Sequence, residues 1–251
     1  MKADRLQWGL AHTVFLAVAL GLAELAARAG WLDPAFFGQP SGVAAYLWNN
    51  LGTAKFWSDL GWTLGETLAS FVLGGVAAFA VGLAFVRWPV LERFADPYFN
   101  ALNVMPRIAL APLFILWFGL GAGSKIAVGF SVCFFIVLSA TVAGIRGVSQ
   151  DHVTLCRTLG ASAAATFFRV TLPGAVPVIF SGLRLGLTYS LLGVVGTEII
   201  ASEKGLGQTL AYLGSTFDIN GVMALLLVLA LLGVGIVRLM TWAEKRLLHW
   251  Q

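Results

Sequence analysis

Charged residues are scarce in this sequence of 251 residues: Asp, Glu, Lys and Arg make up 11% of it, whereas hydrophobic residues make up 59%. A soluble globular domain carries about 25% charged residues, so this chain has less than half of the charge that a water-facing surface needs. The composition excludes a disordered chain, a collagen, a coiled coil and a small disulfide-bonded secreted fold. A chain embedded in a lipid bilayer remains, in agreement with the mean hydropathy of +0.86.

Residue types that carry covalent or metal chemistry are also few. The two cysteines, Cys133 and Cys156, lie in segments of different polarity and have no metal-ligand spacing. The three histidines, His12, His152 and His249, lie far apart, which argues against a membrane enzyme. No Gly is followed by Lys, so the chain has no Walker A loop for ATP. We therefore expect no catalytic residue, cofactor or metal site in this chain, and the scattered basic residues give no reason to expect a nucleic-acid partner.

Six apolar stretches are each long enough to cross a bilayer, because a transmembrane helix needs about 20 apolar residues. They lie approximately at Trp8–Ala27, Leu64–Val86, Tyr98–Gly119, Ile126–Ala143, Val176–Ala201 and Gly221–Met240. The sequence therefore predicts an all-α polytopic membrane protein with six transmembrane helices. The first stretch could also be a cleaved signal peptide, but we expect it to be retained, since the sixth span and the charge distribution both require it.

Basic residues are distributed unevenly among the loops between these stretches. With the N-terminus in the cytoplasm, only Arg28, Lys55, Lys125 and Lys204 fall on the outer side. The other 12 of the 16 Lys and Arg residues fall on the inner side, and Arg107 of the third span is counted among them. By the positive-inside rule, this distribution predicts six spans with both termini in the cytoplasm.

Two of the connecting segments are longer than the others. Residues 28–63 form an outer segment of mixed polarity, for which we expect a short interfacial helix capped by Ser41. Residues 1–63 would then be an N-terminal helix with this interfacial segment. Residues 64–251 would be a core domain that contains the longest inner loop, residues 144–175.

The first half of the inner loop predicts a short surface helix. Ser149 or Asp151 can cap the N-terminus of this helix, which runs through His152–Arg157. Gly160 can end it, because glycine accepts the left-handed backbone conformation that often follows a helix.

The second half of the loop predicts another short helix. Ser162 can cap it, its body is Ala163–Thr171, and Leu172-Pro173 is expected to stop it. A pair of short helices that lies on the membrane surface has the right shape to dock into a groove of a partner protein.

Five motifs of this sequence resemble those of one protein family. They are RTLGAS at Arg157–Ser162, LPGAVP at Leu172–Pro177, GLRLGL at Gly182–Leu187, MPRIALAPLFILWFGLGAGSKIA at Met105–Ala127 and GTEIIASEKGLGQTL at Gly196–Leu210. The chain from Leu64 to Met240 resembles the membrane subunit of bacterial ABC importers, the binding-protein-dependent inner-membrane family. Within the family it is similar to the permeases for nitrate, taurine and aliphatic sulfonates.

The resemblance implies a fold, a location and a set of partners. The fold would be that of a type I (MetI-like) importer permease in the bacterial inner membrane, surrounded by membrane lipid. The partners would be a second copy of the chain or a related permease, two cytoplasmic ATPase subunits that bind ATP and Mg²⁺, and a periplasmic or lipid-anchored substrate-binding protein. The chain itself would be a transport subunit and not an enzyme.

In that family the inner loop docks into the ATPase, and Gly160 stands where the family has a near-obligatory glycine. The docking residues carried over to this chain are Asp151, Thr154, Leu155, Cys156, Arg157, Gly160, Ala161 and Ser162. This sequence departs from the family motif at its Glu-Ala-Ala, where it has Thr154, Leu155 and Cys156. The departure removes one charge contact with the ATPase and leaves open whether Thr154 alters the coupling.

Candidate pathway or gate residues lie in the third and fifth spans. Met105-Pro106 and Pro112 interrupt the third span, and each proline can act as a hinge that lines the passage or as a packing kink. Phe118 can narrow an outer gate or fill space in the bundle. Glu198 can line the passage or lie near the outer water.

Other charged residues of the spans are expected to have structural roles. Glu24 and Glu66 are expected at solvated helix ends, and Arg184 at the interface or at a subunit contact. A secondary transporter or channel is the alternative function, but the spans carry few ionisable groups and show no inverted half-repeat. The expected substrate is a small organic or inorganic anion, such as an aliphatic sulfonate, taurine or nitrate.

Overall fold

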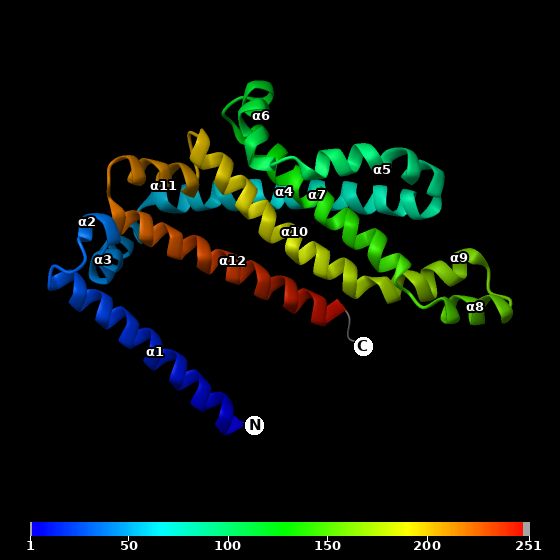
Figure 1. The fold of residues 1–251 in the computed structure, drawn as a ribbon, viewed down its shortest axis with the longest axis horizontal. Helices are drawn as coiled ribbons and strands as arrows, with labels where there is room; N and C mark the ends of the chain where they lie inside the picture. Colours follow the sequence, from blue (N-terminus) through cyan, green and yellow to red (C-terminus); the bar gives the residue numbers. More distant parts are fainter. Residues whose placement is uncertain (1, 248–251) are drawn as a thin grey trace.

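The structure is a computed structural model that describes residues 2–247, and every regular element in these residues is a helix (Figure 1). In chain order the elements are α1 (Lys2–Arg28), α2 (Pro34–Phe37), α3 (Pro40–Leu51), α4 (Ala54–Arg87), α5 (Pro89–Val104), the 3₁₀ turn η1 (Arg107–Leu110), α6 (Ala111–Phe118), α7 (Ala122–Arg146), α8 (Gln150–Thr158), α9 (Ala163–Thr166), the π turn η2 (Phe167–Thr171), α10 (Leu172–Ile200), α11 (Leu206–Ser215) and α12 (Ile219–Leu247).

By length and composition, the described helices include five membrane spans, and six when one bent pair is counted as a single span. The bent pair is formed by α5 with η1 and α6. Helix α4 has 34 residues, which corresponds to about 51 Å at 1.5 Å per residue. The hydrocarbon core is about 30 Å thick, so α4 extends well beyond it.

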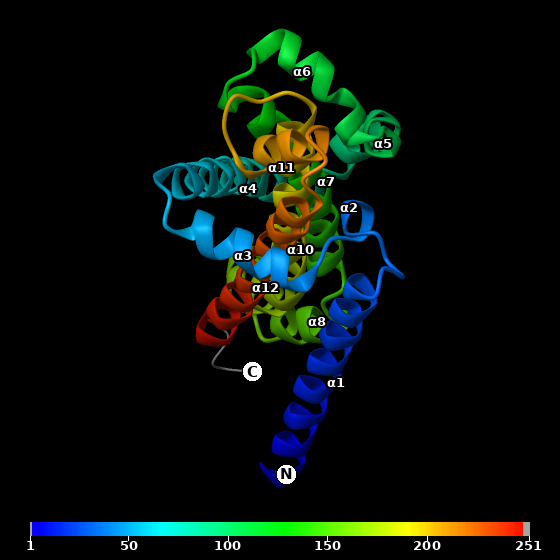
Figure 2. The ribbon, with the colours of Figure 1, turned by 90° about the vertical axis from the view of Figure 1, so that its left-hand side faces the viewer.

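The bundle has two distinct ends, which Figure 1 shows at its right and left. We call them the α8 end, which carries α8 and α9, and the α11 end, which carries α3 and α11. The start of α1 and the end of α12 both point in the direction of the α8 end. Helix α1 stands apart from the bundle along most of its length (Figure 2). Helix α6 projects from the bundle on another side. The surface of α1 is largely exposed in the single chain.

Helix α7 packs between α4 and α10 and forms the centre of the bundle. Small residues allow the helix backbones to approach closely at this interface. A Cβ atom built on Gly182 would lie 2.2 Å from the Cβ of Ala140, and one built on Gly193 would lie 3.3 Å from the Cα of Gly129. The packing reading of these glycines, expected from their spacing, therefore holds at the α7–α10 contact.

The third span differs from the continuous helix expected at Tyr98–Gly119. Helix α5 ends at Val104, and the segment Arg107–Phe118 that follows is bent by 88° relative to α5. Met105 is extended because the residue before a proline disfavours helical dihedral angles. Pro112 makes no kink, since it lies in the first turn of α6, where its missing N–H has no helical partner to lose.

The expectation that Leu172-Pro173 stops a helix is wrong. The segment from α9 through η2 to α10 is one helical run, Ala163–Ile200. The N–H of Leu172 bonds to the carbonyl of Phe167, five residues earlier, in a widened π turn. Pro173 therefore lies in the first turn of α10, where a proline is tolerated.

Glu24 of α1 caps the N-terminus of helix α3. Ser41 lies inside the first turn of α3 and is not its cap, because the helix already begins at Pro40. The carboxylate of Glu24 accepts hydrogen bonds from the backbone N and Oγ of Ser41, at 3.0 and 2.9 Å, and from Nε2 of Gln39 at 2.8 Å. A carboxylate is favoured at a helix N-terminus. Glu24 lies at the end of α1 and is not buried, in agreement with a solvated helix end, and it also joins α1 to α3.

We predict that Gly182→Ala destabilises the protein, because its Cβ has no room beside Ala140. Overpacking of a close helix contact costs about 1–3 kcal/mol. The midpoint of thermal unfolding in detergent measures the effect. Gly235→Ala in α12 is the matched control, because a Cβ there meets nothing within 4 Å. Equal midpoints for the two variants would contradict the close α7–α10 packing.

Candidate functional site

The α8–α9 loop contains the short helix α8, a glycine turn and the start of the long run that begins with α9. The first helix and the glycine turn agree with the sequence prediction, whereas the second helix does not end at Leu172-Pro173. The Oγ of Ser149 accepts a hydrogen bond from the N–H of Asp151 at 3.3 Å at the start of α8. Gly160 has a φ of +83°, which favours glycine. The Oγ of Ser162 accepts a hydrogen bond from the N–H of Ala165 at 3.2 Å at the start of α9. Each capping residue therefore has the local role that its position in the sequence indicates.

The surface of this loop is accessible along its whole length. The predicted docking residues are all exposed or half-buried: Asp151, Thr154, Leu155, Cys156, Arg157, Gly160, Ala161 and Ser162. Apolar side chains contribute much of the surface, with Leu155 57% exposed, Leu159 78% and Phe168 66%. Exposed apolar residues on this polar segment favour an interaction surface. Sequence reasoning did not single out Leu159, although it lies within the RTLGAS motif, and it missed Phe168, which lies outside the motif.

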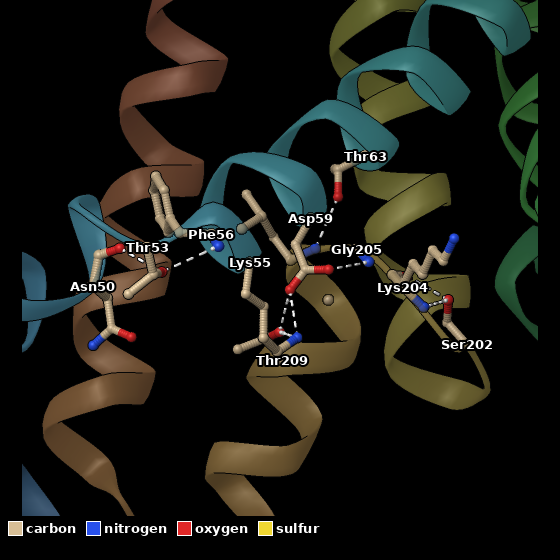
Figure 3. A network of polar contacts seen from close by, with 12 residues as sticks. Asn50, Thr53, Lys55, Phe56, Asp59, Thr63, Ser202, Lys204, Gly205 and Thr209 are labelled. Carbon is tan, nitrogen blue, oxygen red and sulfur yellow. Dashed lines mark hydrogen bonds and ion pairs between the residues drawn. The ribbon is translucent and has the colours of Figure 1, made fainter.

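A network of buried polar groups joins three helices at the α11 end, and Figure 3 shows part of it. Glu198 of α10 is 1% exposed. Its carboxylate accepts hydrogen bonds from Oγ1 of Thr63 at 2.8 and 3.1 Å and from the N–H of Gly207 at 2.8 Å. The same Thr63 Oγ1 accepts a hydrogen bond from the N–H of Leu206 at 2.9 Å. Glu198 therefore holds α4, α10 and the start of α11 together.

Asp59 extends this network by one helical turn along α4 (Figure 3). It accepts hydrogen bonds from the N–H of Gly205 at 3.2 Å and from Oγ1 of Thr209 at 2.9 Å, and it pairs with Lys55 at 2.7 Å. Neither Asp59 nor Thr63 was a candidate from the sequence, since an isolated polar residue near a helix end gives no signal of its partners. The bonds of Glu198 go to groups inside the chain, and its role in a gate or passage stays a prediction.

Glu66 and Lys125 form a second buried contact at this end of the bundle. The two side chains are 4% and 3% exposed, and Nζ of Lys125 lies 3.6 Å from Oε1 of Glu66. Lys125 also donates a hydrogen bond to the carbonyl of Leu120 at 3.0 Å. The expectation that Glu66 is a solvated helix end is therefore wrong, because the start of α7 packs over it.

Arg184 also has a partner inside the chain. It forms an ion pair with Glu244, which joins α10 to α12. This contact is different from the interfacial or subunit contact expected for Arg184.

A polar cavity of about 330 Å³ lies between α5, α7 and the end of α4. Its polar lining consists of Glu92, Asp96, Asn100, Asn103, Ser139 and Arg146. The first four lie on α5 at intervals of three or four residues, so they share one face of that helix. Glu92 and Arg146 form an ion pair. Polar and ionisable groups are expensive within a membrane, so a face of this kind marks a wet surface or a passage.

The other pathway candidates are divided between this cavity and more distant positions. Met105 and Pro106 follow the end of α5 directly and form the break beside the cavity. Phe118 is 56% exposed at the far end of α6. Phe118 and Glu198 are not among the residues that line the cavity, so the structure does not bring the proposed pathway residues together in one site.

Residues 70–249 match the family described as "Binding-protein-dependent transport system inner membrane component". The match covers well over half of the chain, which therefore belongs to this family and is a permease subunit of an ABC importer. Its apolar helices and this membership make it a multi-pass inner-membrane protein.

Three relatives illustrate the range of the family. The chain is 27% identical to the taurine transport system permease protein of Escherichia coli (strain K12), over 100% of this chain and 95% of the relative. It is 31% identical to a permease protein of the same strain named for aliphatic sulfonates transport, over 84% and 80%. It is 32% identical to the riboflavin transport system permease protein of Chloroflexus aurantiacus, over 87% and 82%.

Solved structures of ABC importers show the same fold. An amino acid ABC transporter crystallised with histidines matches with a TM-score of 0.68 at 18% identity, over 80% of this chain and 98% of that chain. An inward-facing MetNI methionine ABC transporter matches with a TM-score of 0.63 at 19% identity, over 75% and 92%. The fold is therefore the type I, MetI-like permease fold expected from the sequence.

We predict that Glu198→Ala destabilises the α11 end of the bundle. The change leaves the hydroxyl of Thr63 and the N–H of Gly207 without their acceptor, at a cost of about 1–3 kcal/mol for each buried donor. A lower midpoint of thermal unfolding and faster proteolysis between α10 and α11 measure the effect. Glu203→Ala, on the exposed part of the same loop, is the matched control. If both variants unfold at the same temperature, Glu198 does not join the three helices.

Proposed function

We propose that this chain forms, with a second copy of itself, the passage of an ATP-driven importer. Two cytoplasmic ATPase subunits dock on the α8–α9 loops of the two copies, and a periplasmic or lipid-anchored binding protein delivers the solute at the α11 end. The observation that carries this proposal is the exposed, partly apolar surface of α8 and α9, which lie on either side of the glycine turn at Gly160 and project from the bundle.

The polar cavity between α5 and α7 supports the presence of a second copy. Its residues Asp96, Asn100 and Asn103 are exposed at the surface of the single chain. Facing lipid, a charged side chain at mid-membrane costs about 2.5–3.5 kcal/mol on insertion scales. A second copy that faces this side would enclose the polar surface in a common passage and remove that cost.

The charge distribution supports the orientation. With the α8 end in the cytoplasm, the loops at that end carry most of the Lys and Arg residues, and both chain termini lie on the cytoplasmic side. ATP and Mg²⁺ would be bound by the partner ATPases, because this sequence has no phosphate-binding loop. The division at residue 63 would separate an N-terminal helix and interfacial segment from the core permease domain.

The substrate we propose is a small anion, such as taurine, an aliphatic sulfonate or nitrate. Two of the three relatives described above are named for taurine and aliphatic sulfonates, and the third is named for riboflavin. The separate binding protein would set most of the specificity in this arrangement. A transporter that works without ATP is the alternative function.

We predict that Gly160→Asp breaks the coupling between the permease and its ATPase, so that both transport and stimulated ATP hydrolysis fall, while the protein still inserts into the membrane. A non-glycine residue strains the left-handed turn by about 1–2 kcal/mol and adds a charge to the docking surface. In proteoliposomes that contain the permease, its ATPase and its binding protein, ATP-dependent uptake and stimulated ATPase activity should both fall at least tenfold. Gly30→Asp is the matched control, because Gly30 has a φ of +74° and equally open surroundings but lies away from the α8 end.

Two results would contradict the proposed function. Uptake by the wild-type protein that needs no ATP would indicate the alternative transporter. Equal coupled activity of the Gly160 and Gly30 variants, with the ATPase still bound to the permease, would move the docking surface away from the α8–α9 loop.

A further inference from the structure

Arg107 lies in the break of the third span, although the positive-inside count places it with the cytoplasmic Lys and Arg residues. Arg107 is the first residue of η1, directly after Pro106. Helix α5 begins near the α8 end and runs back along α4 (Figure 1). Its 16 residues correspond to about 24 Å, which is roughly half the length of α4. Arg107 is therefore near the middle of the bundle and not at the inner surface, where the positive-inside count places it.

The guanidinium group of Arg107 has an aromatic neighbour but no acceptor. Its Cζ lies 4.2 Å from the centroid of the Phe135 ring. Its Nη2 is buried and has no hydrogen-bond partner, and within residues 2–247 the side chain forms no hydrogen bond or ion pair. A buried charged donor without an acceptor is strongly unfavourable. The residue as a whole is half-buried, so one N–H group of Arg107 is buried without an acceptor in the described residues while the rest of the guanidinium can be reached from outside the single chain.

Phe135 connects this group to the polar cavity, because it lines the cavity on the α7 side. The other arginine there, Arg146, is already paired with Glu92. The remaining acid, Asp96, lies at least two helical turns before the break, toward the α8 end. Arg107 is thus an unpaired cation beside the cavity. The unpaired acid Asp96 of the preceding helix, α5, lies too far along the chain to neutralise it.

We infer that Arg107 binds the acidic group of the transported solute, a sulfonate or a carboxylate, as the solute crosses the passage, and that Phe135 holds the guanidinium in place. A planar guanidinium offers paired N–H donors that match the oxygens of such a group, and stacking on an aromatic ring orients it. An ionisable residue at mid-membrane depth is a functional site by default. This inference rests on the proposed function, since it needs the chain to line the passage for an anion.

The test compares four proteins in proteoliposomes that contain the complete complex: wild type, Arg107→Gln, Arg107→Lys and Arg93→Gln. Arg93 lies on α5, the helix that precedes the break, is exposed and is not among the residues that line the cavity. The readouts are uptake of labelled taurine and ethanesulfonate, ATPase activity stimulated by the binding protein, and the midpoint of thermal unfolding.

We expect Arg107→Gln to reduce uptake at least tenfold while stimulated ATPase activity and the unfolding midpoint stay close to wild type, because the docking loop is distant. Arg107→Lys keeps the charge but loses the paired N–H donors and the stacking on Phe135, so its uptake should lie between those of wild type and Arg107→Gln. Arg93→Gln should match wild type in every readout.

Three results would overturn the inference. If Arg107→Gln takes up both probes like wild type, Arg107 does not bind the solute, although the proposed importer stands. If Arg107→Gln lowers the unfolding midpoint or separates the two copies, and Arg107→Lys does the same, the role is structural. If the wild-type complex takes up neither probe, nor nitrate, the proposed anion transport fails and this inference fails with it.

Discussion

The hydrocarbon core of a bilayer offers no water to polar groups, and this constraint explains most of the structure. Each charged or backbone group that lies within the bundle must find a partner in the chain, in a second chain or in a wet passage. Glu198 and Asp59 find theirs in hydroxyls and in backbone N–H groups at the start of α11. Within the described residues, Arg107 has no such partner, and on the polar face of α5 only Glu92 is paired, with Arg146; these groups are the starting point for the proposed passage and solute site.

The continuous run from α9 to α10 gives the bundle a direct mechanical connection between its ends. The run spans Ala163–Ile200 without a flexible loop, because the π turn accommodates Pro173. It begins at the exposed α8–α9 loop and ends at the Glu198 network, which holds α4 and α11. A displacement of α9 by a docked ATPase would therefore act on the opposite end of the bundle through a rigid helix.

The third span combines two features that depend on each other. The break at Met105-Pro106 removes helical hydrogen bonds within the span, and irregular backbone at this depth persists only where it is buried or lines a cavity. The polar face of α5 supplies such a cavity beside the break. A proline pattern that sequence alone interprets as a hinge, a gate or a packing kink is, in the structure, the point where one span divides into two helices bent by 88°.

The sequence by itself determined the membrane class, the six crossings, the caps of α8 and α9 and the family, because each depends on composition, local periodicity or a short motif. It did not predict that Glu66 and Glu198 are buried, that Glu24 caps α3 or that Leu172-Pro173 continues a helix. It also counted Arg107 among the cytoplasmic cations. These features depend on contacts between helices that are far apart in the chain. Only tertiary packing decides which polar residue gains a partner within the chain and which residue remains unpaired.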